Sequence, residues 1–139
     1  MCDVKQEYFD GEFIRADLFS DVAEKAVDCI KTSTREDGRD RRENPRKKPS
    51  STQIRKFYEE VLNLKDILDN GKDFKEILPY FKMLKAKANV AYQRDVINTN
   101  FKRFIDENVD YVGDDEKKFK VFCTFFEAVV AYAKGKIKD

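Results

Sequence analysis

The 139-residue sequence contains no histidine and no tryptophan, and only three prolines and five glycines. Without histidine there is no base for Ser–His–Asp or Cys–His catalysis and no ligand set for an HExxH zinc site. The three cysteines, Cys2, Cys29 and Cys123, are widely separated and form no CxxC pair. This pattern predicts reduced thiols, two of them in the core, and no disulfide framework.

Long hydrophobic runs are also missing. No segment approaches the roughly 18 apolar residues of a membrane span, and the first residues lack the charge order of a secretory signal. Gly71 and Gly113 are isolated, so no phosphate-binding glycine loop is present. The acidic pairs near Asp106 and Asp114 fall at predicted helix ends, where capping explains them better than a metal does. We therefore expect a cytoplasmic protein that is not an enzyme, with no cofactor, metal or membrane partner.

Charge and aromatic residues are abundant. Charged residues make up 40% and aromatic residues 13%, including twelve phenylalanines, which predicts one domain over residues 1–139 with a Phe-rich core. The net charge of +1 conceals a polar distribution. Residues 1–30 hold eight acids and three bases, a net of −5, whereas residues 31–48 hold eight bases and four acids, a net of +4. The acidic end could meet a basic face of a further copy of the chain.

Helical periodicity dominates outside one segment. Apolar residues recur every fourth position from Ile14 to Ile30, which predicts a helix over 13–30. Residues 31–49 contain no hydrophobic side chain and predict a long, basic, exposed loop. Residues 50–136 predict the rest of the helical core. The expected fold is all-α, a single-domain bundle of about five helices with the basic loop after the first helix.

The helices after the loop have recognisable ends. Ser50 and Gln53 have capping-box spacing, and Asp69-Asn70-Gly71 ends the helix that they open. Pro79 predicts the first residue of a third helix that runs to about Arg94. A fourth helix is expected over about 97–109, and the acidic residues 114–116 suit the start of a fifth helix.

Two basic stretches are candidate binding sites. In the first, Lys47 and Lys48 lead into the helix that Ser50 caps, so cations, hydroxyls and free amides meet where a phosphate can bind. The alternative is a solvated loop before an ordinary cap. In the second, Lys87 and Arg94 are seven residues apart and share a helix face, whereas a neighbouring face carries Lys82 and Lys85. Its alternative is a solvated helix surface. The aromatic cluster at 122–126 could stack bases, but its helical spacing favours the core.

Three stretches together resemble a known family: SSTQIRKFYEEVLNLK (50–65), MLKAKANVAYQRD (83–95) and FFEAVVAYAK (125–134). They resemble the small subunit of type III-A CRISPR effector complexes, the Csm small subunit, over about 49–134. The resemblance implies a non-catalytic helical subunit that stacks with further copies of itself and with the other Csm subunits along a guide RNA and its target RNA.

The resemblance also implies which residues contact RNA. The contacts carried over from the first two stretches are Ser50, Thr52, Gln53, Arg55, Lys56, Lys85, Lys87 and Arg94. Lys47 and Lys48 join them from the basic segment. Because any guide sequence must be accepted, these residues are expected to bind backbone rather than bases. The main alternative is a helical protein–protein adaptor with no nucleic-acid role. A second is a duplex-binding protein that acts alone.

Overall fold

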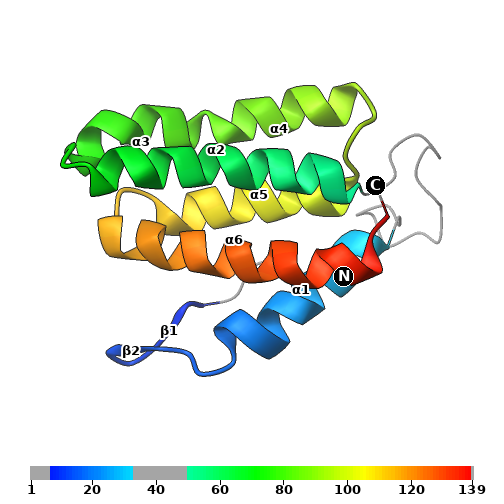
Figure 1. The fold of residues 1–139 in the computed structure, drawn as a ribbon, viewed down its shortest axis with the longest axis horizontal. Coiled ribbons are helices and arrows are strands. Elements are labelled where there is room, and N and C mark those ends of the chain that lie inside the picture. The colour runs from blue at the N-terminus through cyan, green and yellow to red at the C-terminus, as the bar shows by residue number, and fades with distance from the viewer. Residues whose placement is uncertain (1–6, 33–49, 139) are drawn as a thin grey trace.

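A computed structural model describes residues 7–32 and 50–138. This part of the chain forms a helix bundle with a small hairpin on one side (Figure 1). The elements are β1 (Phe9–Asp10), β2 (Phe13–Ile14), a π-helical turn (Leu18–Val22), α1 (Ala23–Lys31), α2 (Ser51–Asp69), α3 (Phe74–Lys82), α4 (Leu84–Gln93), α5 (Thr99–Val112) and α6 (Glu116–Lys136). The predicted all-α bundle is confirmed, with α3 and α4 following each other where one helix was expected.

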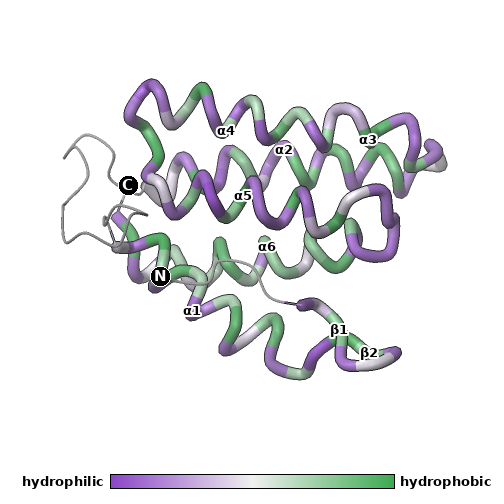
Figure 2. The backbone as a smooth tube through the Cα atoms, turned by 180° about the vertical axis from the view of Figure 1, so that it is seen from behind, coloured by the Kyte–Doolittle hydropathy of each residue, from purple (hydrophilic) through white to green (hydrophobic). Residues whose placement is uncertain are grey.

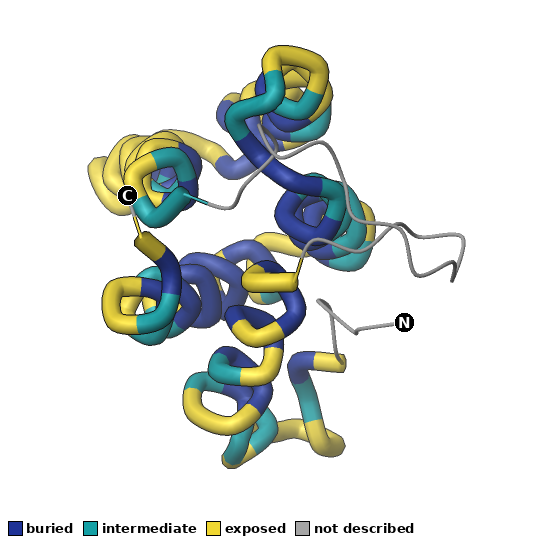
Figure 3. Tube along the Cα trace, turned by 90° about the vertical axis from the view of Figure 1, so that its right-hand side faces the viewer, coloured by how far each residue is buried: buried dark blue, intermediate teal, exposed yellow. Residues whose placement is uncertain are grey.

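Phenylalanine rings fill the centre of the bundle. The ring of Phe104 lies edge-on to that of Phe126, with centroids 5.2 Å apart. Phe81 on α3 meets Phe119 on α6 in the same way at 5.0 Å. Buried residues line the inner sides of the helices and exposed residues the outer sides (Figure 3), so polar and apolar residues alternate along each helix (Figure 2). The predicted Phe-rich core is confirmed, including residues 122, 125 and 126 and two buried cysteines.

The N-terminal segment differs from the predicted helix over 13–30. Phe13 and Ile14 form β2, which pairs with β1 in an antiparallel hairpin. Gly11, with φ of 66°, takes the first position of the two-residue loop, where a tight hairpin needs a positive φ. The helical part begins only at Leu18, in the π-helical turn that leads into α1. The prediction is therefore wrong for the first turn of this segment.

The start of the predicted third helix is also wrong. Asp73 caps α3, and Pro79 lies inside that helix rather than at its first residue. Proline has no amide hydrogen, so one intrahelical hydrogen bond is missing there. Regular helix is interrupted at Met83, after which α4 begins. The buried residues of α3 have helical spacing of their own: Phe74, Ile77 and Phe81.

The packing brings two ends of the described chain together. α1 lies along α6 (Figure 1), and the ammonium of Lys136 lies 2.9 Å from the carboxylates of both Glu24 and Asp28. α2 begins and α4 ends at this same end of the bundle, which the figure places near the C-terminus. This end therefore carries the described part of the first predicted basic stretch, from Ser50 onward, and Arg94, the last residue of the second.

Candidate nucleic-acid interface

α2 begins at a capped N-terminus, as the capping-box spacing predicts. The hydroxyl of Ser50 accepts a hydrogen bond from the amide of Gln53, with 3.3 Å between the two atoms. The amide of Ser51 donates to the main-chain carbonyl of Lys138, 3.2 Å away, so the end of the chain lies against the start of α2. Two amides that were candidates for a phosphate are thus already bonded within the protein.

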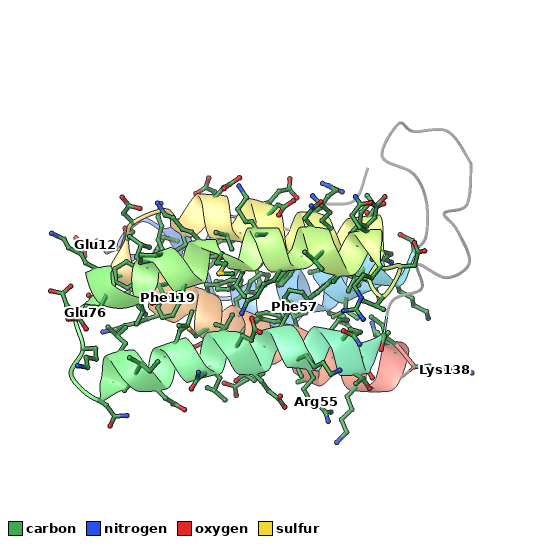
Figure 4. The ribbon with its side chains drawn as sticks, turned by 90° about the horizontal axis from the view of Figure 1, so that it is seen from above. Glu12, Arg55, Phe57, Glu76, Phe119 and Lys138 are labelled. Atoms are coloured by element: carbon green, nitrogen blue, oxygen red, sulfur yellow. The ribbon has the colours of Figure 1, made fainter. Side chains whose placement is uncertain are left out.

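The cations in the second turn of α2 face solvent. Arg55 and Lys56 are exposed, and Arg55 points away from the bundle (Figure 4). Neither side chain forms an ion pair with any residue of 7–32 or 50–138. α2 has no acidic residue in its first turn, so the partial positive charge of the helix start is uncompensated there. Together with exposed Thr52 and half-buried Gln53, these residues form what we call the α2 surface.

Lys87 connects α4 with α2. Its ammonium lies 3.1 Å from the carboxylate of Glu60. Lys56 is one helical turn before Glu60 and so lies on the same side of α2. Arg94, the exposed C-cap residue of α4, is seven residues after Lys87 and lies along the same face of that helix. Lys56, Glu60 and Lys87 therefore line one seam between α2 and α4, and Arg55 lies beside it on the outer side of α2.

The other lysines of the second stretch lie on the opposite flank of the α3–α4 rod. The ammonium of Lys85 is 2.7 Å from Asp110, and that of Lys82 is 2.7 Å from Asp114. The hydrogen bond to Asp110 raises the pKa of Lys85. Lys82 and Lys85 form ion pairs with residues at or just beyond the end of α5, whereas Lys87 forms one with α2. The structure thus does not gather all the predicted contacts: Lys85 lies toward α5, away from the seam.

Lys47 and Lys48 fall outside the described residues. Their predicted contribution to the α2 surface is therefore not addressed by the structure.

Sequence reasoning missed a groove of about 610 Å³ between α2, α3 and α4. Tyr80 on its edge is 64% exposed, and Met83 and Val90 on the same rod are also exposed. In the sequence, Tyr80, Met83, Lys87, Val90 and Arg94 follow one another at steps of three and four residues. This spacing already indicated that they share one side of the rod. The groove is lined by Glu60, Asn63, Leu64, Ile67, Lys72, Glu76, Ile77, Tyr80, Leu84 and Lys87.

The described side chains offer binding chemistry. Among them, no three cysteines or carboxylates gather closely enough to hold a metal ion, and none of their helices is long and apolar enough to span a membrane. Burial raises the pKa of the Cys123 thiol to about 12, so its nucleophilic thiolate is scarce at neutral pH. Exposed lysine and arginine, by contrast, bind phosphate oxygens through charge and hydrogen bonds without reading bases.

The described residues form a small helix bundle with a phenylalanine core, exposed charged side chains and one short hairpin. The sequence model of the Csm2 Type III-A family matches residues 24–138, and the chain belongs to that family. The family consists of non-catalytic small subunits of type III-A CRISPR complexes, so the partners of the chain include other Csm subunits. No curated protein and no solved structure matches the chain significantly.

The family match extends the resemblance that the sequence displays over 49–134. It begins inside α1 and includes nearly all of that helix. The hairpin and the π-helical turn precede the match. The match therefore includes helices α2 to α6 and nearly all of α1.

Proposed function

We propose that this small subunit binds the backbone of the guide–target RNA duplex without sequence preference, and that it packs side by side with further copies of itself and with the backbone subunits. The seam between α2 and α4 carries this proposal. Its cations are Lys56, Lys87 and Arg94, with Thr52 and Gln53 beside them, and Arg55 adds a further cation on the outer side of α2. Ser50 contributes mainly by capping α2, and the contribution of Lys47 and Lys48, which lie outside the described residues, stays a prediction.

The observation that supports the proposal most is the exposure of Arg55 and Lys56 at a helix start without an acidic residue. A phosphate there gains from the helix dipole and from two cations that no described carboxylate neutralises. Lys87 and Arg94 extend the positive surface across to α4. A phosphate can replace Glu60 as the partner of Lys87 at little cost, because an exposed ion pair contributes only about 0–1 kcal/mol.

Lys85 is less well placed to contact RNA than Lys87. Its ammonium is directed toward Asp110 on α5, so a duplex lying along the seam would not meet it without a change of side-chain direction. We therefore expect replacement of Lys85 to weaken RNA binding less than replacement of Lys87. This ranking distinguishes the contacts that the geometry favours from those that the resemblance alone implies.

The test compares Arg55→Ala and Lys56→Ala with Lys120→Ala, using the purified chain and two RNA duplexes of unrelated sequence. Lys120 is an exposed cation on α6, paired with Glu116 at the other end of the bundle, and serves as the matched control. The first two variants are expected to weaken binding equally for both duplexes and to reduce the salt slope by about 1 each. The control should leave both quantities unchanged.

A single copy is expected to bind weakly, because neighbouring copies on one duplex supply avidity. The second measurement is therefore a purification of the tagged protein from its own cells, with sequencing of the RNA that accompanies it. Short RNAs with one constant flank and different spacers, together with larger proteins, would support the proposal. Protein partners without such RNA, and no salt-dependent affinity of the purified chain, would favour the adaptor alternative instead.

A further inference from the structure

The hairpin presents an aromatic ring beside a carboxylate. Phe13 on β2 is 76% exposed, and the antiparallel register places it directly opposite Asp10 on β1. Opposed residues of a hairpin lie on the same face, with their Cβ atoms about 4.5–5.5 Å apart. Asp10 is exposed as well, and it forms no ion pair with any residue of 7–32 or 50–138. We call these two residues the Phe13–Asp10 face.

The other face of the hairpin shows which side chains its rings attract. Phe9 on that face packs against the core, and the ammonium of Lys117 lies 5.1 Å from its ring centre. The ammonium of Lys118 lies 4.4 Å from the ring centre of Tyr111, whose hydroxyl donates to the carboxylate of Glu7. A lysine, an aromatic ring and a carboxylate thus already combine beside the hairpin. The Phe13–Asp10 face has the ring and the carboxylate, but no cation from the described part of the chain.

The hairpin is held firmly in place. The buried hydroxyl of Tyr8 donates to the side-chain oxygen of Asn108 over 2.7 Å, and the amide of Tyr8 donates to the hydroxyl of Tyr111 over 3.1 Å. Because the ring of Phe13 is presented on an ordered hairpin, a partner binds it at a low entropic cost.

The charge of this region indicates the kind of partner. Residues 7–21 contain five acids and one base, a net of −4. The base, Arg15, is itself paired with Asp17 at 3.2 Å. This charge repels an RNA backbone, and the proposed RNA seam lies between α2 and α4, on the side of the bundle away from the hairpin (Figure 1). The region therefore favours a basic protein segment.

A second copy of this chain offers no matching surface among its described residues. Outside the hairpin, their exposed large hydrophobic residues lie on α2 and on the α3–α4 rod: Leu62, Ile67, Tyr80, Met83 and Val90. Lys87 and Arg94 on that rod belong to the proposed RNA seam. Lys82 and Lys85 pair with carboxylates, and the groove carries two acids as well as two lysines. We therefore expect the partner to be a different subunit.

We propose that the Phe13–Asp10 face binds an arginine or lysine side chain in a basic segment of another Csm subunit. A cation within about 6 Å of an aromatic ring is attracted to the face of the ring, and the apolar stem of its side chain packs beside it. The charged head then meets the carboxylate of Asp10. This inference rests on the proposed packing with the other subunits and names one surface that forms it.

The first test measures how tightly the full chain joins a complex assembled from the other Csm subunits of its own cells and guide RNA. Asp10→Asn should weaken this association about two- to fivefold, the range of one exposed ion pair, and make it less sensitive to salt. Phe13→Ser should weaken it about tenfold or more, because an aromatic anchor is lost.

The matched controls make the same chemical changes on α2. They are Asp66→Asn, at an exposed carboxylate, and Leu62→Ser, at an exposed apolar residue. Both should join the complex as tightly as the wild type. The unfolding midpoint of every variant is measured, and it should stay unchanged in Asp10→Asn and Phe13→Ser, because both side chains are exposed.

The second test identifies the partner directly. The photoreactive residue p-benzoylphenylalanine replaces Phe13 in the assembled complex, and mass spectrometry locates the residues to which it is joined on illumination. The expected product joins this chain to another Csm subunit, at a segment with more lysine and arginine than aspartate and glutamate. The same replacement at Tyr80, a ring that is 64% exposed on the α3–α4 rod, should not join that segment.

Several outcomes would overturn the proposed contact. These are a cross-link from position 13 only to RNA, only to a second copy of this chain or to a segment without net positive charge, and the absence of any cross-link. Association of Asp10→Asn and Phe13→Ser as tight as that of the wild type would overturn it too. Both variants should bind an isolated RNA duplex with wild-type affinity. Normal RNA binding without the cross-link therefore overturns only the hairpin contact, and the cross-link without RNA binding overturns only the RNA seam.

Discussion

The side-chain amide of Asn98 donates a hydrogen bond to the main-chain carbonyl of Ile30, 2.6 Å away, and so ties the start of α5 to the end of α1. Asn100, two residues later, makes a similar contact, its side-chain amide donating to the carbonyl of Cys29 at 2.6 Å. The last carbonyls of a helix have no intrahelical donor, and here two buried asparagines supply one. The chain is therefore fixed at the point where it leaves α1 for the basic segment.

Replacing this asparagine should destabilise the bundle. Asn98 also caps α5, because its side-chain oxygen accepts from the amide of Phe101 at 2.9 Å. Asn98→Ala removes the cap and leaves the carbonyl of Ile30 without this donor, so we expect the free energy of unfolding to fall by about 2–4 kcal/mol. Urea unfolding followed by circular dichroism measures the loss. Asn70→Ala is the control, since the Asn70 side chain bonds only at an exposed helix end, and equal losses in the two variants would contradict the prediction.

The hydroxyl of Tyr8 provides a second stability test. Tyr8→Phe keeps the ring but removes the donor to the oxygen of buried Asn108. We expect a loss of about 1–3 kcal/mol in the free energy of unfolding, because a buried acceptor is left unpaired. Hydrogen exchange should also become faster in the hairpin that Tyr8 anchors. Tyr80→Phe makes the same chemical change at an exposed ring and should leave the free energy of unfolding nearly unchanged. Equal losses of stability in the two variants would show that the buried hydrogen bond does not stabilise the fold.

The buried thiol of Cys123 makes stability depend on alkaline pH. Burial raises its pKa from 9.0 to about 12. Between these values the unfolded chain has lost a proton that the folded chain keeps, so raising the pH favours unfolding. Because of this thiol, the free energy of unfolding should fall by at most about 1.4 kcal/mol per pH unit between pH 9 and 12. Below pH 9 the thiol should not make the free energy of unfolding depend on pH.

In Cys123→Ala, the free energy of unfolding should therefore fall less steeply between pH 9 and 12 than in the wild type. At pH 8 the variant should still be less stable, because the smaller side chain leaves a cavity in the core. Thr124→Ala, at the exposed neighbouring position, should keep the wild-type slope. Some slope remains in both variants, because burial also raises the pKa of Tyr8 well above its ordinary value. Equal slopes in Cys123→Ala and the wild type would show that the thiol ionises no differently in the folded and unfolded chains. Guanidinium unfolding at a series of pH values is the measurement.

Local signals predicted the second helix well and the first poorly. Ser50 caps α2, and Gly71 just beyond its end has φ of 100°, as the sequence indicated. In the first helix, Ile14 continued the four-residue spacing by coincidence. Gly11 before it was the better signal, because as the first residue of the two-residue loop it permits the positive φ that reverses the chain there. Pro79 was given too much weight, since a cap at Asp73 and apolar spacing through α3 outweigh one missing hydrogen bond.

The sequence placed Lys87 and Lys85 on different sides of the helix, but it could not predict their partners. Steps of three and seven residues determine the side of the helix, so Lys87 and Arg94 were placed together and Lys85 apart. That Lys87 meets Glu60 depends on the α3–α4 rod lying between α2 and α5, as Figure 4 shows. Such packing involves residues far apart in sequence, and so does the groove, which needs three helices to exist.

The pairing of Lys87 with Glu60 leads to a prediction of tighter RNA binding. Glu60→Gln keeps the size of the side chain but removes the carboxylate that neutralises Lys87 and repels a nearby phosphate. If RNA lies along the seam, its affinity should rise by about two- to fivefold, the range expected for one exposed ion pair. The salt dependence should become steeper, because one more cation is available to phosphate. Binding isotherms at several salt concentrations measure both effects.

Net charge alone could produce a similar gain, so the control must change charge equally. Glu116→Gln does so, since it releases Lys120 from an exposed pair of the same kind at the other end of the bundle. Only a change at the seam should tighten binding, and adding Lys87→Ala to Glu60→Gln should abolish most of the gain. If Glu116→Gln tightens binding as much, RNA responds to overall charge and the seam is not its site. If neither variant changes the affinity, phosphate does not approach Lys87, and the α2 surface must act without α4.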